Sequence, residues 1–131
     1  MKLLDTTFLI DFLEGKLQDL NILNSLEEEK LCTTYLNIYE VIIGIFYSGK
    51  EINKRIEKAN IFFNRLKILN LNENSSIMSA KIRANLMKSG EEIQHIDCLI
   101  SGIAIENGIN MIVTKNKKHF EKIPGIKVED Y

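Results

Sequence analysis

The stretch Lys2-Leu3-Leu4-Asp5-Thr6-Thr7-Phe8-Leu9-Ile10-Asp11 decides the fold class of this chain. It begins as a short apolar strand and continues as a helix, because apolar residues recur at helical spacing from Phe8 to Leu13. Asp5 therefore lies at the junction between a strand and a helix. In open α/β sheets the ligand crevice lies at the carboxyl ends of the strands, which makes Asp5 a candidate site residue. The alternative is that Asp5, or Thr6 after it, only caps the helix.

Composition predicts a single domain, residues 1–131, in a reducing cytoplasm. The chain has one proline and no linker-like or repeated segment. Cys32 and Cys98 lack the spacing of a redox or zinc site, so both are expected to be core thiols. No signal peptide or membrane span is apparent. With a net charge of −1, nucleic-acid contacts would have to come from local basic patches.

Short apolar strands alternate with helices along the rest of the chain. Further strands are predicted at 31–33, 67–71, 111–114 and 126–128, and helices at 17–29, 35–47, 51–66, 74–88 and 96–106, with a turn at 116–120. This alternation predicts an α/β fold with a mainly parallel sheet covered on both faces. The helix at 35–47 is apolar nearly all round and is expected to be buried. The helix at 51–66 is expected to be a half-exposed arm.

Two further acids stand out by their positions in these elements. Glu40 lies within the apolar helix at 35–47, where a buried carboxylate without a partner would cost several kcal/mol. It therefore has a basic partner, is protonated, faces a polar cleft or lies at the exposed edge of the helix. Asp97 opens the helix at 96–106, where it could be a ligand or simply a favourable charge at a helix N-terminus. If Asp5, Glu40 and Asp97 converge, they must take up protons or bind a cation, and oxygen ligands suit Mg²⁺ or Mn²⁺ better than zinc.

Other chemistries are less well supported. His95 and His119 lack the spacing of a zinc-binding helix, and His95 is interpreted as a surface residue or a neighbour of Asp97. A phosphoryl-transfer enzyme with Asp5 as nucleophile usually has a second acid close behind it, where Thr7 stands. Dinucleotide binding is excluded because no glycine-rich fingerprint follows the first strand.

Four segments in order resemble the PIN-domain ribonucleases, and most closely the VapC-type toxins of toxin–antitoxin pairs. These segments are residues 3–11, 40–44, 96–101 and 112–116, the last followed by Phe120. The resemblance covers essentially the whole chain. It implies a three-layer α/β/α sandwich with a central, mainly parallel sheet, and cleavage of RNA with Mg²⁺ or Mn²⁺ as cofactor.

The resemblance also implies which residues form the site. Asp5, Glu40 and Asp97 match the acidic metal cluster, and Asn116 matches a further catalytic position in the fourth segment. Many family members carry an acid at the position of Asn116 or of His119, so the number of metal ions stays open. Because Asn116 follows a strand, the alternative is that it is only a turn residue.

Four residues are expected to position substrate, namely Thr6, Thr114, Lys115 and Lys117, although the lysines also suit a solvated turn. By similarity, the partners are RNA, a small cognate antitoxin and a second copy of the chain. Ile56, Phe62 and Phe63 are candidates for a dimer face or for the core. The alternative function is a PIN-like module that binds RNA or protein without cleaving it.

Overall fold

Five parallel strands form one central sheet in the order β3-β2-β1-β4-β5. The structure, a computed structural model, describes residues 1–17 and 30–131, so the helix predicted at 17–29 lies almost entirely outside the described residues. The strands are β1 (Lys2–Leu4), β2 (Leu31–Thr34), β3 (Lys67–Leu69), β4 (Met111–Val113) and β5 (Lys127–Glu129). All five were predicted to within a few residues, and the parallel sheet is confirmed.

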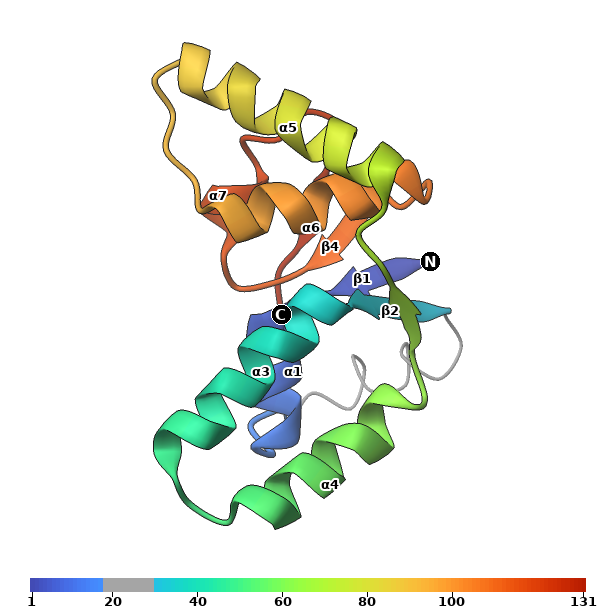
Figure 1. Cartoon of the computed structure of the whole chain (residues 1–131), viewed down its shortest axis with the longest axis vertical. Coiled ribbons are helices and arrows are strands. Elements are labelled where there is room, and N and C mark those ends of the chain that lie inside the picture. The colour runs from blue at the N-terminus through green and yellow to red at the C-terminus, as the bar shows by residue number, and fades with distance from the viewer. Residues whose placement is uncertain (18–29) are drawn as a thin grey trace.

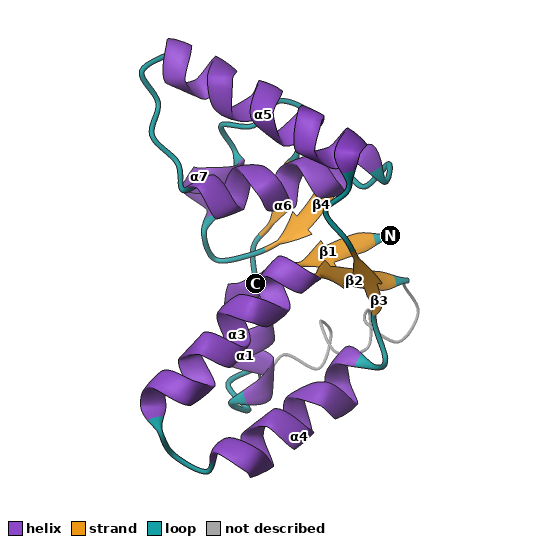
Figure 2. Ribbon diagram, in the orientation of Figure 1, coloured by secondary structure: helices purple, strands orange, loops and turns teal. Residues whose placement is uncertain are grey.

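Helices cover both faces of this sheet (Figure 1). They are α1 (Thr6–Leu13), α3 (Tyr35–Ser48), α4 (Ile52–Phe63), α5 (Glu73–Lys88), α6 (His95–Glu106) and α7 (Lys117–Phe120). Figure 2 shows α1, α3 and α4 on one side of the strands and α5, α6 and α7 on the other. The three-layer α/β/α sandwich is therefore confirmed. None of the helices in the described part of the chain is long and apolar enough to cross a membrane.

Each face of the sheet has its own hydrophobic core, because successive side chains of a strand point to opposite faces. Leu3 lies in the core under α5 and α6, whereas its neighbour Leu4 lies in the core under α1, α3 and α4. Cys32 and Cys98 are both buried and free, as predicted. Phe62 and Phe63 are also buried, so the core interpretation of these two residues is correct and the dimer-face interpretation is wrong.

The strand order reverses beside β1. The chain runs from β1 to β2 and β3 on one side, and then crosses to β4 and β5 on the other. At such a reversal the loops after the two neighbouring strands diverge and leave a crevice at their carboxyl ends. Asp5 follows β1 and Thr114 follows β4, so both flank this point.

Two predictions about individual elements are wrong. The face of α3 that carries Tyr39, Phe46 and Tyr47 is exposed, and Tyr47 is 93% exposed, although the sequence pattern predicted a buried helix. Residues 117–120 form the short helix α7 rather than a plain turn. The predicted arm is α4, which packs Ala59, Phe62 and Phe63 into the core and exposes its other face.

Candidate active site

Asp5 is the buried centre of the candidate site. It is 2% exposed and occupies the N-cap position of α1, but its side chain makes no capping hydrogen bond. Instead, Thr114 Oγ1 donates to Oδ2 at 2.7 Å, and Asn37 Nδ2 donates to Oδ1 at 3.1 Å. The carboxylate is therefore held from two sides of the crevice, by the segment after β4 and by α3. The capping interpretation of Asp5 does not explain these contacts.

Asn37 is a site residue that the sequence analysis missed. It is fully buried on α3, and its Nδ2 donates to Thr6 Oγ1 at 3.0 Å as well as to Asp5. Its Oδ1 accepts from the backbone N–H and the hydroxyl of Thr34, while its own N–H donates to Thr34 Oγ1. This reciprocal pair is a capping box, which fixes the first turn of α3. The spacing of Thr34 and Asn37 at the start of an apolar helix was the available signal.

Glu40 lies one turn further along α3 and is half-buried. Thr6 Oγ1 donates to its Oε1 at 2.7 Å. Because the same Thr6 oxygen accepts from Asn37, Thr6 links Glu40 to the amide that holds Asp5. The structure gives Glu40 this hydroxyl as a partner, in place of the basic partner considered from the sequence. None of the ion pairs formed by the described residues involves Glu40 or Asp5.

Asp97 reaches the same region from the first turn of α6 and is 5% exposed. Nδ1 of His119, on α7, lies 3.0 Å from its Oδ2. With Asp97 ionised, this contact requires the proton on Nδ1 of the imidazole. His119, and not the exposed His95, is therefore the histidine that orients Asp97.

Burial and mutual repulsion act on all three candidate acids. Burial raises the pKa of Asp5, and burial also raises the pKa of Glu40 and of Asp97. Repulsion adds to this effect, because Asp5 raises the pKa of both other acids and Asp97 raises that of Glu40. The hydrogen bonds from Thr114, Thr6 and His119 act in the opposite direction. Such unneutralised, mutually repelling carboxylates are typical of functional sites.

The donor set suits a hard divalent cation. In the described part of the chain, no three His, Cys, Asp or Glu side chains are gathered closely enough to enclose a metal ion as they are placed. Each acid instead turns toward its own donor, namely Thr114, Thr6 or His119. Carboxylate oxygens that repel one another at a crevice are nevertheless the ligands that Mg²⁺ and Mn²⁺ prefer. The chemistry of the three side chains is therefore of the kind that suits such an ion.

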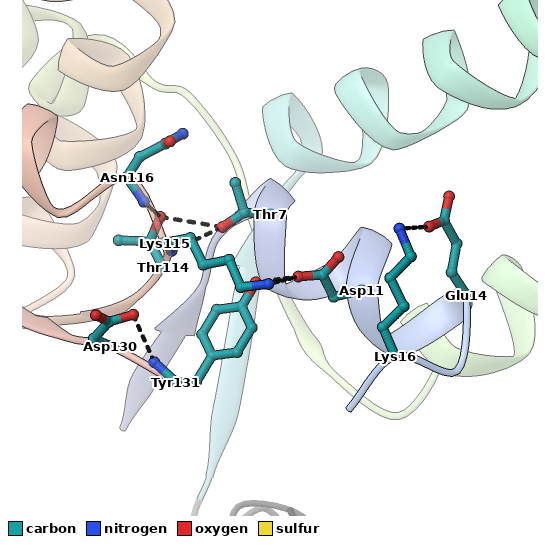
Figure 3. Close-up of polar contacts among 9 residues, drawn as sticks. All are labelled: Thr7, Asp11, Glu14, Lys16, Thr114, Lys115, Asn116, Asp130 and Tyr131. Carbon is teal, nitrogen blue, oxygen red and sulfur yellow. Dashed lines mark hydrogen bonds and ion pairs between the residues drawn. The ribbon is translucent and has the colours of Figure 1, made fainter. Parts of the chain in front are cut away.

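The segment after β4 contains four predicted site residues, and Figure 3 shows three of them, Thr114, Lys115 and Asn116. Thr114 is buried and bonded to Asp5, whereas Asn116 is exposed at the N-cap position of α7 without a side-chain cap bond. Lys117 pairs with Glu121 at 3.5 Å on the surface. Lys115 points away from the acids, and its Nζ lies 2.6 Å from Asp11 Oδ2. The structure thus brings Thr6 and Thr114 to the acids and directs Lys115 elsewhere.

The fold and this site define a class of protein. The chain matches the PIN domain family over residues 2–126, and it belongs to that family. Among its relatives is the tRNA(fMet)-specific endonuclease VapC of Salmonella typhimurium, which is 30% identical over 130 residues, or 98% of this chain and 96% of that protein. The VapC of Shigella flexneri, with the same name, is 26% identical over 129 residues.

Solved structures agree with this assignment. The DNA-bound VapBC of Salmonella typhimurium is 29% identical, with a TM-score of 0.87 over 98% of this chain and 96% of that chain. VapBC2 of Rickettsia felis, bound to a DNA fragment from its promoter, has a TM-score of 0.89 at 24% identity and covers 99% and 98% of the two chains. The similarity to the Rickettsia felis structure shows a shared fold.

Proposed function

We propose that this chain is an endoribonuclease of the VapC type, the toxin of a toxin–antitoxin pair. The observation that carries the proposal is the mutual repulsion of Asp5, Glu40 and Asp97 in a PIN domain, where none of the ion pairs among residues 1–17 and 30–131 involves Asp5 or Glu40. The endonuclease names of the relatives from Salmonella and Shigella support it. Because those relatives are named for a tRNA, we infer that a tRNA is the substrate to test first.

We propose that Asp5, Asp97 and Glu40 hold Mg²⁺ or Mn²⁺. A bound ion of this kind lowers the pKa of a ligated water and stabilises charge on the scissile phosphate. The chain's own residues orient the ligands. Thr114 holds Oδ2 of Asp5, and Thr6 holds Oε1 of Glu40.

Asn116 and Lys117 are the proposed contacts to substrate. The Asn116 backbone N–H donates to Thr114 Oγ1 at 2.9 Å, which leaves its exposed amide side chain free to bind a phosphate oxygen. Lys117 is about half exposed beside it, and its surface pair with Glu121 is weak enough to be exchanged for a phosphate. Neither residue is expected to bind the metal ion tightly.

The decisive experiment measures cleavage of a tRNA pool by purified chain that is free of partner protein. We expect cleavage with Mg²⁺ or Mn²⁺ and none with EDTA or with Asp5→Asn. Glu57→Gln, which changes an exposed acid on α4, is the matched control and should cleave normally. If the wild-type chain binds tRNA and does not cleave it with either metal, the non-cleaving PIN-like module is the correct function.

We also propose two protein partners, an antitoxin and a second copy of the chain. Related structures are complexes named VapBC, which supports an antitoxin. For the second copy, the exposed apolar face of α3 replaces the earlier candidates as the proposed surface. This face consists of Tyr35, Ile38, Tyr39, Ile42, Ile43, Phe46 and Tyr47. Sedimentation of wild type against Phe46→Lys tests the proposal, since only the wild type should be a dimer.

A further inference from the structure

The segment after β4 is attached to α1 through the hydroxyl of Thr7. The Lys115 N–H donates to Thr7 Oγ1 at 3.1 Å, and the hydroxyls of Thr7 and Thr114 lie 3.2 Å apart. The Asn116 N–H in turn donates to Thr114 Oγ1. The position of Thr114 relative to Asp5 therefore depends on how firmly residues 114–116 lie against α1.

The Lys115 side chain adds a second attachment to α1. Its Nζ pairs with Asp11 Oδ2 at 2.6 Å and lies 5.1 Å from the centre of the Tyr131 ring (Figure 3). Asp11 is largely buried whereas the Lys115 side chain is 54% exposed, so the pair is shielded from water on the carboxylate side only. The ammonium group is thus held by a carboxylate and an aromatic face.

Tyr131 completes the arrangement from the last residue of the sequence. Its hydroxyl donates to Asp11 Oδ2 at 2.9 Å, the same oxygen that Lys115 contacts. Its ring packs edge-on against buried Phe8, with the ring centres 5.1 Å apart. Burial raises the pKa of Tyr131, while the Lys115 hydrogen bond lowers that of Asp11, so both groups keep these roles at neutral pH.

We propose that Asp11, Lys115 and Tyr131 form a clamp that positions Thr114 and Asn116 against α1, and that Lys115 is not a contact to RNA phosphate. This inference rests on the proposed nuclease function for its kinetic consequences. It revises the role of Lys115 expected from the sequence and assigns positioning roles to Asp11 and Tyr131, neither of which touches the acids of the site in the contacts above.

Amide hydrogen exchange of the metal-free protein tests the clamp directly. In Tyr131→Phe, which keeps the ring, and in Lys115→Met, which keeps the aliphatic stem, the amides of residues 115 and 116 should exchange roughly tenfold faster. The matched control is Lys54→Met. Lys54 pairs with Glu51 at 3.9 Å on the surface beside α4, away from the charges that act on Asp11. Its removal should leave both amides unchanged.

Kinetics and salt dependence test the role of Lys115. If Lys115 acts through the clamp, Lys115→Met should lower kcat by about tenfold with little change in KM, because the variant loses the positioning of Thr114 and Asn116 and no contact to substrate. Its RNA affinity should keep the wild-type salt slope, whereas loss of a phosphate contact reduces that slope by about 0.7–0.9. Lys117→Met is the comparison in which the slope should fall.

Two results would overturn the clamp. One is unchanged exchange at residues 115 and 116 in both Tyr131→Phe and Lys115→Met. The other is a reduced salt slope for Lys115→Met with normal kcat, which would make Lys115 a phosphate contact. If the wild-type chain cleaves no RNA, the proposed function fails, but the exchange measurement still decides the clamp.

Discussion

Thr6, Thr114 and His119 each donate a hydrogen bond to one of the three site acids. They come from different elements, α1, the segment after β4 and α7, so each acid is oriented by a neighbour that is distant in sequence. The sequence made the three acids candidates because a carboxylate at a strand end or in an apolar helix is conspicuous. It did not identify Asn37 or His119 as their partners, because those contacts depend on how α3 and α7 pack.

Asp97→Asn is predicted to stabilise the metal-free protein. The amide oxygen can still accept from His119, while the repulsion with Asp5 and Glu40 disappears. We expect the unfolding free energy to rise by about 1 kcal/mol, which corresponds to roughly 3–5 °C in Tm for a chain of this length.

The same variant should lose the stabilisation that a bound ion gives. Wild type should gain about 2.7 kcal/mol at Mn²⁺ concentrations of roughly 100 times Kd, and Asp97→Asn almost none. Thermal melts with Mn²⁺ and with EDTA measure both effects. Identical melts of the two proteins under both conditions would contradict a shared acidic site.

At the scale of elements, helices and strands were predictable because apolar periodicity and capping residues are local signals. Which face of each helix is covered by the rest of the chain was not predictable in this way. In α3 the buried positions Asn37, Val41 and Ile45 recur every four residues, and the apolar residues between them face outward. An all-apolar pattern cannot distinguish a face covered by the chain itself from one left uncovered.

The packing of α5 on α6 depends on a glycine. A Cβ built on Gly102 would lie 1.9 Å from Ser79 Oγ and 2.8 Å from the Ser79 backbone nitrogen. Because the backbone as well as the side chain is in the way, the helices must separate to admit a methyl group. Gly102→Ala should therefore destabilise the protein by roughly 1–3 kcal/mol or more, despite its better helix propensity.

Urea unfolding measures this loss. The control is Gly44→Ala on α3, where an added Cβ would meet nothing within 4 Å and should be neutral or stabilising. Equal stability of the two variants would show that α5 and α6 do not approach as closely as described.

At the scale of the whole molecule, the site lies at one edge of a sheet whose two faces carry separate cores. The repulsion among its acids therefore lowers the free energy of unfolding of the whole domain. Burial raises the pKa of Asp5, Glu40 and Asp97 in the native state, so the native protein takes up protons above pH 4 that the unfolded chain does not. Stability of the metal-free protein should thus increase as the pH falls from 7 toward 5.

Asp11 makes stability depend on pH in the opposite direction, and it does so at lower pH. Its pKa is lowered by Lys115, so the stability it contributes is present above its ordinary value of 3.8 and is lost as the pH falls through its native pKa. Urea midpoints in EDTA at pH 5, 6 and 7 test the first trend, and Asp97→Asn should show a shallower slope. A wild-type midpoint that rises from pH 5 to 7 would contradict the charge distribution described.

The capping box of α3 has a consequence for how this protein can change by mutation. The Asn37 side-chain oxygen accepts from Thr34 at the start of the helix, and the side-chain nitrogen donates to Asp5. A substitution at position 37 therefore alters the start of α3 and the orientation of Asp5 at once. In a randomised library, most variants at this position should be eliminated for instability before any effect on activity can be selected.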